Sequence, residues 1–165
     1  MPTTTVRDSV RGTGQLKWLA ALALCVAGPG WSSPSDGVPA QFMHASLHIE
    51  TSTGRRDFDV QVAASSEEQE LGLMWVRILP VNQGMIFPMD PPRLASFWMK
   101  NTYIPLDMLF LDRRGRVACI RTAVPLTLDN VTCPEVAGAV LEIAGGQAAE
   151  QHIRVGDRVS WKPRS

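Results

Sequence analysis

The chain has 165 residues, the length of one ordinary domain, and its 16 Lys+Arg balance its 16 Asp+Glu to a formal net charge of zero. A chain without a cationic excess does not fit a protein that neutralises the phosphate backbone, so we expect no nucleic acid partner.

The first 40 residues differ in composition from the rest of the chain. Three basic residues precede an apolar run from Trp18 to Gly28, and a Pro/Gly/Ser-rich stretch follows. The run is about half as long as the roughly 20 residues that cross a bilayer, which is typical of a secretory signal peptide. We therefore expect residues 1–40 to be a signal peptide with a linker and residues 41–165 to be a single exported β-rich domain, periplasmic or extracellular. Retention of the run as an uncleaved anchor is the alternative.

Removal of this segment changes the charge only slightly. The chain loses Arg7, Arg11, Lys17, Asp8 and Asp36, which leaves 13 basic and 14 acidic residues. It also leaves no stretch that we expect to form a stable membrane span.

Cys119 and Cys133 are the two cysteines that remain once Cys25 is removed with the segment. An oxidising compartment permits a disulfide between them, and a loop of this size would stabilise the fold by about 3 kcal/mol. Whether their Cα atoms approach closely enough does not follow from the sequence, so a disulfide and two separate thiols both stay open. No CxxC pair supports a redox role.

A β-hairpin is the first element predicted in the domain. Apolar and polar residues alternate over Ala45–Glu50, and the period of two resumes over Phe58–Val62 after a turn at Thr51–Gly54. This pattern is typical of two antiparallel strands.

A helix is predicted next. Ser65 and Glu68 have the spacing of a capping box, and acidic residues in the first turn suit the helix dipole. Apolar residues from Leu71 onward recur at helical spacing. These signals predict a helix from about Ser66 to Val76.

Short strands are predicted in the rest of the chain. Met85–Phe87 is an apolar run that we expect Pro88 and the pair at 91–92 to end, and Thr127–Pro134 is predicted to be a polar loop. Further strands are predicted at Ala95–Lys100, Met108–Asp112, Arg116–Thr122, Ala139–Ile143 and Arg158–Trp161, with a second short helix near Gln147–His152.

About seven short strands joined by short turns predict a mainly β (α+β) domain with one or two short helices. We expect a compact, antiparallel, barrel-like arrangement with a helix at one end.

The segment Phe97–Asp107, FWMKNTYIPLD, places a polar triplet at 100–102 between apolar runs. Asn and Thr side chains bond to nearby backbone and Pro105 fixes a local φ, so the triplet can simply shape a corner between two strands. Aromatic faces beside polar donors, as at Trp98, are also the mixture that small-molecule pockets use. The sequence leaves the corner and the site edge as two interpretations.

Asp107 and Glu142 are two acids placed among apolar neighbours. Burial of a lone charge is costly, so each carboxyl is expected either to point outward or to be paired. Three roles stay open: a structural clamp, a ligand contact, and, if both face one cleft, an acid/base pair.

No motif indicates a metal or a cofactor. His44 and His48 would lie on one face of a strand but about 13 Å apart, too far for one zinc ion. Gly145-Gly146 is not followed by the pattern of a nucleotide-binding loop, and no GxSxG occurs. We expect no metal site and no cofactor.

Four segments, in this order, resemble the family called domain of unknown function 192: GLM at Gly72–Met74, GMIF at Gly84–Phe87, FWMKNTYIPLDMLFLD at Phe97–Asp112 and VLEIAGG at Val140–Gly146. The similarity runs from about residue 58 to residue 159. Members are typically exported or membrane-tethered prokaryotic proteins with a small β-rich domain and no established activity. The candidate site residues that the resemblance implies are Trp98, Lys100, Asn101, Thr102, Pro105, Asp107 and Glu142.

This chain departs from the family pattern at one position. The pattern has a basic residue two positions after the Met of GLM, where this chain has Val76, followed by Arg77. If that charge lines a site in the family, its place here is in doubt.

We therefore expect an exported binding or interaction module that uses Phe97–Asp107 to contact a small molecule or a cell-envelope partner. The alternative is a hydrolase-like enzyme with Asp107 and Glu142 as its acid/base pair. The sequence favours the binding module over the enzyme.

Overall fold

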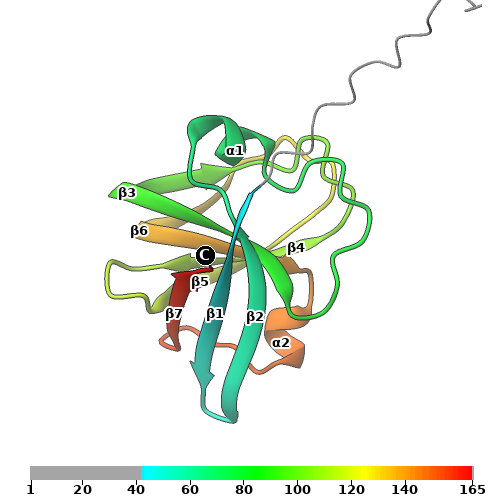
Figure 1. The fold of residues 1–165 in the computed structure, drawn as a ribbon. Coiled ribbons are helices and arrows are strands. Elements are labelled where there is room, and N and C mark those ends of the chain that lie inside the picture. Colours follow the sequence, from blue (N-terminus) through cyan, green and yellow to red (C-terminus); the bar gives the residue numbers. More distant parts are fainter. Residues whose placement is uncertain (1–41, 165) are drawn as a thin grey trace, which may run out of the picture. The chain divides into compact units, whose positions relative to one another are not determined.

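The computed structural model describes residues 42–164, so the predicted signal segment and Cys25 lie outside the described residues. The described part contains seven strands and two short helices (Figure 1). In chain order they are β1 (Met43–Thr51), β2 (Gly54–Val62), α1 (Ser66–Leu71), β3 (Gln83–Phe97), β4 (Leu106–Leu111), β5 (Val117–Ala123), β6 (Val131–Ala144), α2 (Gln147–Glu150) and β7 (Arg158–Pro163).

All seven strands belong to one sheet, in the order β5-β4-β6-β3-β2-β1-β7. This confirms the mainly β prediction with short helices, and α1 and α2 lie toward opposite ends of the sheet (Figure 1). Neighbouring strands are antiparallel except β2 and β3, which run parallel. A parallel pair needs a long crossover connection, which here is α1 with the segment after it.

The sheet is not closed, so the barrel-like prediction holds only loosely. Its edge strands, β5 and β7, meet at one isolated bridge between Arg116 and Arg158. Beside the bridge, the Val159 amide donates to the Gly115 carbonyl at 2.7 Å. The two edges therefore touch at one point rather than along their length.

Helix α1 begins as predicted and ends early. The Ser65 hydroxyl accepts from the Glu68 amide while the Glu68 carboxylate accepts from the Ser65 amide, which confirms the capping box. The helix ends at Leu71 rather than at Val76, because Gly72 follows with φ 48°. A positive φ of this kind stops a helix and favours glycine.

Strand β3 continues through the prolines that were expected to end it. Its pairing with β6 shifts between Pro88 and Arg93, where residues 89–92 lie opposite Gly138 alone. This bulge takes the prolines at 91 and 92 out of the hydrogen-bond ladder, where their missing N–H groups would interrupt it. The predicted break is wrong for this reason.

Two other boundaries differ from the prediction. β3 ends at Phe97, so Lys100 lies in the turn that follows the strand and not inside it. β6 begins at Val131, inside the predicted loop, because its first residues pair with the distant end of β3. The remaining predicted strands and the second helix are confirmed, with boundaries moved by a few residues.

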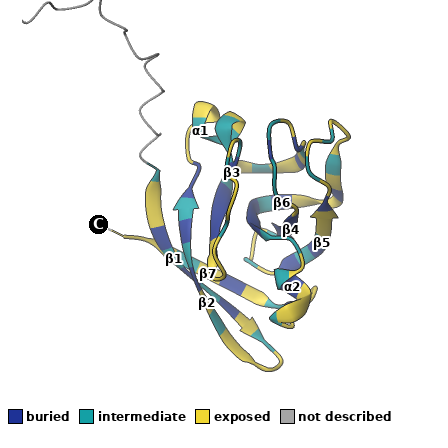
Figure 2. Ribbon diagram, turned by 90° about the vertical axis from the view of Figure 1, so that its right-hand side faces the viewer, coloured by how far each residue is buried: buried dark blue, intermediate teal, exposed yellow. Residues whose placement is uncertain are grey.

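The central strands are largely buried (Figure 2), and apolar residues form a cluster on each of their two faces. A mostly aliphatic cluster, which we call the aliphatic cluster, includes Leu47, Val60, Leu109, Leu141 and Ile143. A second cluster on the opposite face, which we call the Met/Phe cluster, includes Met85, Phe87, Met99, Met108 and Phe110.

Within residues 42–164, no helix has both the length and the apolar character needed to cross a membrane.

Candidate functional site

A pocket of about 270 Å³ opens on the side of the sheet that carries the Met/Phe cluster. Its lining comes from α1 and the turn after it, from β3 and the segment after it, from the first residue of β4, and from β6. The four sequence segments that resemble the family all contribute, through Gly72–Met74, Phe87, the segment beginning at Phe97, and Glu142. Segments that are far apart in the chain therefore build one pocket.

Glu142 is the buried acid of this pocket. It lies in the middle of β6, directly opposite Met85 of β3 on one side and Met108 of β4 on the other. Both methionines are fully buried, and Glu142 itself is only 4% exposed. Burial raises the pKa of the Glu142 carboxyl to about 8, with no contribution from a neighbouring charge or hydrogen bond.

This carboxyl is therefore protonated at neutral pH. In that state it offers one O–H donor and retains a carbonyl oxygen as an acceptor. Among the described residues no side chain forms an ion pair with Glu142, and the pocket lies next to it. The arrangement suits a hydrogen bond to a molecule that enters the pocket.

Cationic side chains also line the pocket. The Arg93 guanidinium donates a hydrogen bond to Gln69 Oε1 at 3.0 Å. The Lys100 ammonium lies 5.0 Å from the centre of the Trp98 ring, and Trp98 is 44% exposed. Each cation therefore contacts a neutral side chain, and neither forms an ion pair with an acid among the described residues.

Aromatic packing fixes the wall beside these groups. The Phe97 ring packs edge-on against Phe87, with 5.1 Å between ring centres, and against Phe110, with 6.3 Å. Such pairs are favourable arrangements of aromatic rings. Phe87 and Phe97 line the pocket while Phe110 supports Phe97 from the Met/Phe cluster.

The polar triplet after β3 shapes a corner, and two of its members, Lys100 and Thr102, also line the pocket. Asn101 has φ 55°, and its carbonyl accepts from the Trp75 amide at 2.8 Å. Thr102 is buried, and its carbonyl accepts a hydrogen bond from the Leu126 amide at 3.1 Å. The corner and the site edge, which the sequence left as two interpretations, are therefore parts of one structure.

Asp107 lies away from the pocket and is anchored within the fold. Its carboxylate accepts from the Ala148 amide at 2.9 Å and from the Thr122 hydroxyl at 2.7 Å, and the residue is 2% exposed. The bond to Ala148 holds the first turn of α2 against β4. Asp107 is therefore a structural clamp.

The sheet register excludes the acid/base pair. Asp107 lies opposite Ile143, whereas Glu142 lies opposite Met108. Paired residues share a face and successive residues alternate, so the two carboxyls point to opposite faces of the sheet. The hydrolase-like alternative required them in one cleft and is wrong on this geometry.

The other predicted site residues divide in the same way. Trp98, Lys100 and Thr102 line the pocket with Glu142, but Asn101 and Pro105 do not. The Pro105 carbonyl accepts from the Gly145 amide at 2.8 Å. A Cβ at position 145 would lie 2.7 Å from the Pro105 Cβ, so the first glycine of the GG pair allows this close contact.

Sequence reasoning missed Arg93 and Gln69. Arg93 follows two prolines in a stretch without a clear pattern, and nothing in the sequence marks it as a pocket residue. Arg77, next to the position where the family pattern has a basic residue, does not line the pocket. Its guanidinium instead lies 4.7 Å from the centre of the Tyr103 ring.

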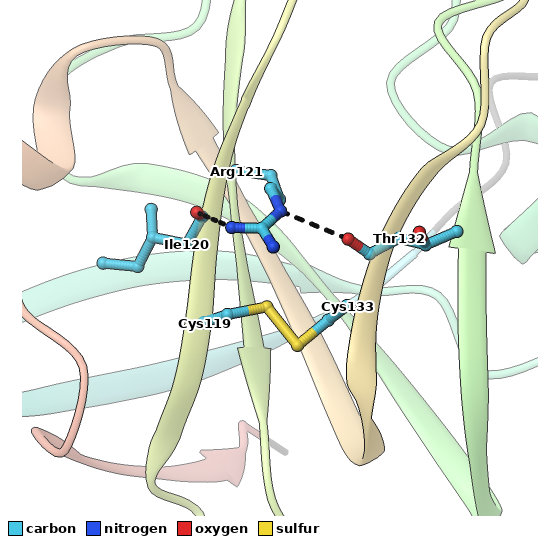
Figure 3. Close-up of a disulfide and its surroundings, with 5 residues drawn as sticks. All are labelled: Cys119, Ile120, Arg121, Thr132 and Cys133. Atoms are coloured by element: carbon cyan, nitrogen blue, oxygen red, sulfur yellow. Dashed lines mark hydrogen bonds between the residues drawn. A yellow bond between two sulfur atoms is a disulfide. The ribbon is translucent and has the colours of Figure 1, made fainter.

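Cys119 of β5 and Cys133 of β6 form a disulfide, with 6.4 Å between their Cα atoms (Figure 3). Both lie in the Met/Phe cluster. Beside them, Arg121 Nε donates to the Thr132 carbonyl at 3.3 Å (Figure 3). The disulfide links the edge strand β5 to the beginning of β6. Of the two alternatives that the sequence left open, a disulfide and two separate thiols, the structure has the disulfide.

In the part of the chain that the structure describes, no group of three His, Cys, Asp or Glu side chains could hold a metal ion.

Comparison with known proteins gives one family and two informative structures. The family model DUF192, described as Uncharacterized ACR, matches residues 48–161. A protein of unknown function from Novosphingobium aromaticivorans DSM 12444 is similar at 38% identity and a TM-score of 0.73, with 76% of this chain and 90% of that chain covered. A protein from Sinorhizobium meliloti 1021 described as a candidate transcription regulator is similar at 32% identity and a TM-score of 0.70, covering 73% and 95% respectively. No curated protein matches the chain.

Proposed function

Since the chain belongs to the DUF192 family of uncharacterized proteins, we propose that it is an exported binding module whose pocket holds a small ligand hydrogen-bonded to Glu142. The proposal places recognition in the pocket beside β3 and β6. Trp98, Lys100 and Thr102 of the predicted surface remain part of the proposed site. Asp107 is no longer part of it, and Arg93 is added.

The buried Glu142 carboxyl is the observation that carries this proposal. The Glu142 carboxyl has no side-chain hydrogen bond or ion pair among the described residues, yet no fully buried side-chain oxygen there lacks a partner, so this carboxyl is accessible from the pocket rather than sealed off from it. A ligand that accepts the Glu142 proton in a hydrogen bond would meet this carboxyl directly on entering the pocket. The position of the carboxyl next to the pocket makes such a ligand the simplest explanation.

The size and rigidity of the pocket define the kind of ligand. A volume of about 270 Å³ is at the lower end of ligand pockets and suits a molecule about as large as an amino acid or a monosaccharide. Glu142 lies between two paired strands and Phe97 is fixed by two aromatic neighbours. A preformed site of this type loses little entropy when it binds.

Two features support the exported location. Residues 1–40 have the pattern of a secretory signal, and the disulfide between Cys119 and Cys133 is of a kind that persists in oxidising compartments. Fusion of residues 1–40 to a reporter enzyme that is active only outside the cytoplasm tests this half of the proposal. An inactive reporter would contradict export.

The binding half is tested by titrating the ¹⁵N-labelled protein with a library of small polar fragments. We expect some fragments to shift amide resonances at 72–74 and 97–102, which border the pocket. Replacement of the acid by a residue of similar size, Glu142→Leu, should abolish these shifts while the fold remains stable, because it removes a buried polar group.

Glu135→Gln is the matched control. Glu135 is an exposed acid on the same strand and does not line the pocket. This variant should bind every fragment as the parent protein does. Absence of any fragment that shifts the pocket amides, or binding that survives in Glu142→Leu, would overturn the binding proposal.

A further inference from the structure

Resting on the proposed function, we further infer that the ligand is a small carboxylate with an apolar body, and that it binds only while Glu142 holds its proton. This names a ligand class and a pH dependence for the pocket. The argument combines the charges around the pocket, the hydrogen-bonding capacity of Glu142, and the apolar side chains that line the rest.

The charges around the pocket favour an anion. Arg93 and Lys100 are its cations, and Glu70 of α1 is the one exposed acid among its lining residues. With Glu142 neutral, the positive charges therefore exceed the negative ones. A field of this sign attracts an anion to the pocket and repels a cation.

The hydrogen-bonding capacity of Glu142 selects a carboxylate among anions of this size. A protonated carboxyl donates one proton, and its strongest acceptor is an ionised oxygen. An O–H···O⁻ bond is short and roughly twice as strong as a bond between neutral groups. The second oxygen of a ligand carboxylate stays available to Arg93 or Lys100.

Apolar side chains complete the pocket around these polar groups. Phe87, Phe97 and Leu106 line it beside Glu142, and the Trp98 ring lies at its exposed margin. Such side chains favour an apolar ligand body, because transferring it from water gains about 25 cal/mol per Å². A small aromatic or aliphatic acid matches both parts of the pocket.

The pH dependence follows from the surroundings of Glu142. Its strand neighbours, Met85 and Met108, carry no charge, and the charged pocket residues are Glu70, Arg93 and Lys100. Burial sets the pKa of Glu142 at about 8. Above that pH the residue loses its donor and places a negative charge next to the anion, so both effects oppose binding.

Three probes of the same shape and different charge test the ligand class: benzoate, benzamide and benzamidine, which is a cation. Each is titrated into the ¹⁵N-labelled protein at about pH 6.5, with the amides at 72–74 and 97–102 as the readout. We expect benzoate to bind at least about tenfold more tightly than benzamide, and benzamidine to show no binding. Equal or tighter binding of benzamide or benzamidine would overturn the carboxylate assignment.

The role of the proton is tested by repeating the benzoate titration up to about pH 9. Benzoate remains ionised throughout this range, so a change in affinity reports the protein. When only the protonated protein binds, affinity falls about tenfold per pH unit above the pKa, which gives about a tenfold loss between pH 7 and pH 9. Glu142→Gln keeps a neutral donor at every pH and should bind benzoate with an affinity that changes less than about twofold over the same range.

Replacement of the cations separates their contribution from that of Glu142. Arg93→Ala and Lys100→Ala should each reduce the preference for benzoate over benzamide by about threefold to tenfold, and they should leave the pH dependence in place. Arg113→Ala is the control, because Arg113 is an exposed arginine on the turn between β4 and β5 and does not line the pocket.

The outcomes distinguish the two proposals. If library fragments bind the pocket but none of the three probes does, the carboxylate assignment fails and the binding module stands. If nothing binds the pocket at all, both proposals fail. A pH profile that is the same in Glu142→Gln and the parent protein would overturn the proton requirement.

Discussion

Asp107 and Glu142 are buried acids on neighbouring strands, and the fold treats them in opposite ways. Asp107 receives two hydrogen bonds, from an amide of α2 and from a hydroxyl of β5. Glu142, on the other face of the sheet, is raised in pKa by burial alone. The first acid holds two elements together, whereas the second costs stability and lies at a pocket.

The two faces of the sheet also differ, since one forms a filled core and the other opens at the pocket. The aliphatic cluster consists largely of Val, Leu and Ile, which pack with defined rotamers into a filled core. The Met/Phe cluster is joined by a disulfide and opens at the pocket. Methionine side chains adapt to irregular space, which suits the side of a sheet that accommodates a ligand. The comparison indicates that one face builds the fold and the other carries recognition.

Replacing Glu142 by the neutral residue glutamine tests this comparison, and it should have the largest effect on the free energy of unfolding. The native pKa of about 8 lies above the ordinary value of 4.5, so the unfolded chain releases this proton first as the pH rises. The free energy of unfolding therefore falls between about pH 4.5 and pH 8. Glu142→Gln does not titrate, so at about pH 9 its free energy of unfolding should exceed that of the parent protein by about 5 kcal/mol, from roughly 1.4 kcal/mol per pKa unit.

Urea denaturation of both proteins at several pH values measures this difference. It should be small below about pH 4.5 and should grow through the window up to about pH 8. The exposed-acid variant Glu135→Gln should follow the parent protein at every pH. Parallel curves for Glu142→Gln and the parent would mean that the Glu142 carboxyl is solvated or paired in the folded protein.

Breaking the anchor of the other acid should have a smaller effect. Asp107→Ala leaves the buried Ala148 amide without its acceptor, which should lower the free energy of unfolding by about 2–3 kcal/mol at neutral pH. Asp107→Asn retains an acceptor for that amide and should lose less. Urea denaturation measures both variants.

Fragment binding adds a second readout to this experiment. Asp107 does not line the pocket, so Asp107→Asn should bind fragments as the parent protein does. Loss of binding in this variant, with the fold intact, would show that the two faces are coupled and would contradict the division drawn above.

Local patterns predicted much of the fold. The alternation over β1 and β2, the capping box of α1 and the hairpin of β4 and β5 depend on residues close together in the chain, and each is confirmed. The errors lie where distant partners decide. β6 begins at Val131 because it pairs with the end of β3, and β3 passes its prolines because a bulge on this strand accommodates them.

The candidate site was predicted in part for a similar reason. Trp98, Lys100, Thr102 and Glu142 belong to segments with a recognisable pattern, and the fold brings them to one pocket. Asp107 belongs to the same pattern but points to the other face, because one residue along a strand reverses the direction of a side chain. Arg93 reaches the pocket through the path of β3 after its bulge, which no sequence signal indicates.

The smallest predicted effect on the free energy of unfolding concerns the weaker of the two hydrogen bonds to Asp107, the one from the Thr122 hydroxyl. Thr122 is an exposed residue of β5, so the hydrogen bond that its hydroxyl donates should contribute less than the buried amide of Ala148. Thr122→Val keeps the shape of the side chain and should lower the free energy of unfolding by about 1 kcal/mol. Thr132→Val, at an exposed threonine of β6, should change it by less than about 0.5 kcal/mol.

The same substitution in the Asp107→Ala background completes the test. With the carboxylate gone, the Thr122 hydroxyl has nothing to donate to, so Thr122→Val should then have almost no effect. The difference between the two backgrounds measures the coupling energy of the pair, expected at about 1 kcal/mol. A Thr122→Val effect that is equal in both backgrounds would show that the hydroxyl acts elsewhere and that the Ala148 amide alone holds Asp107 in place.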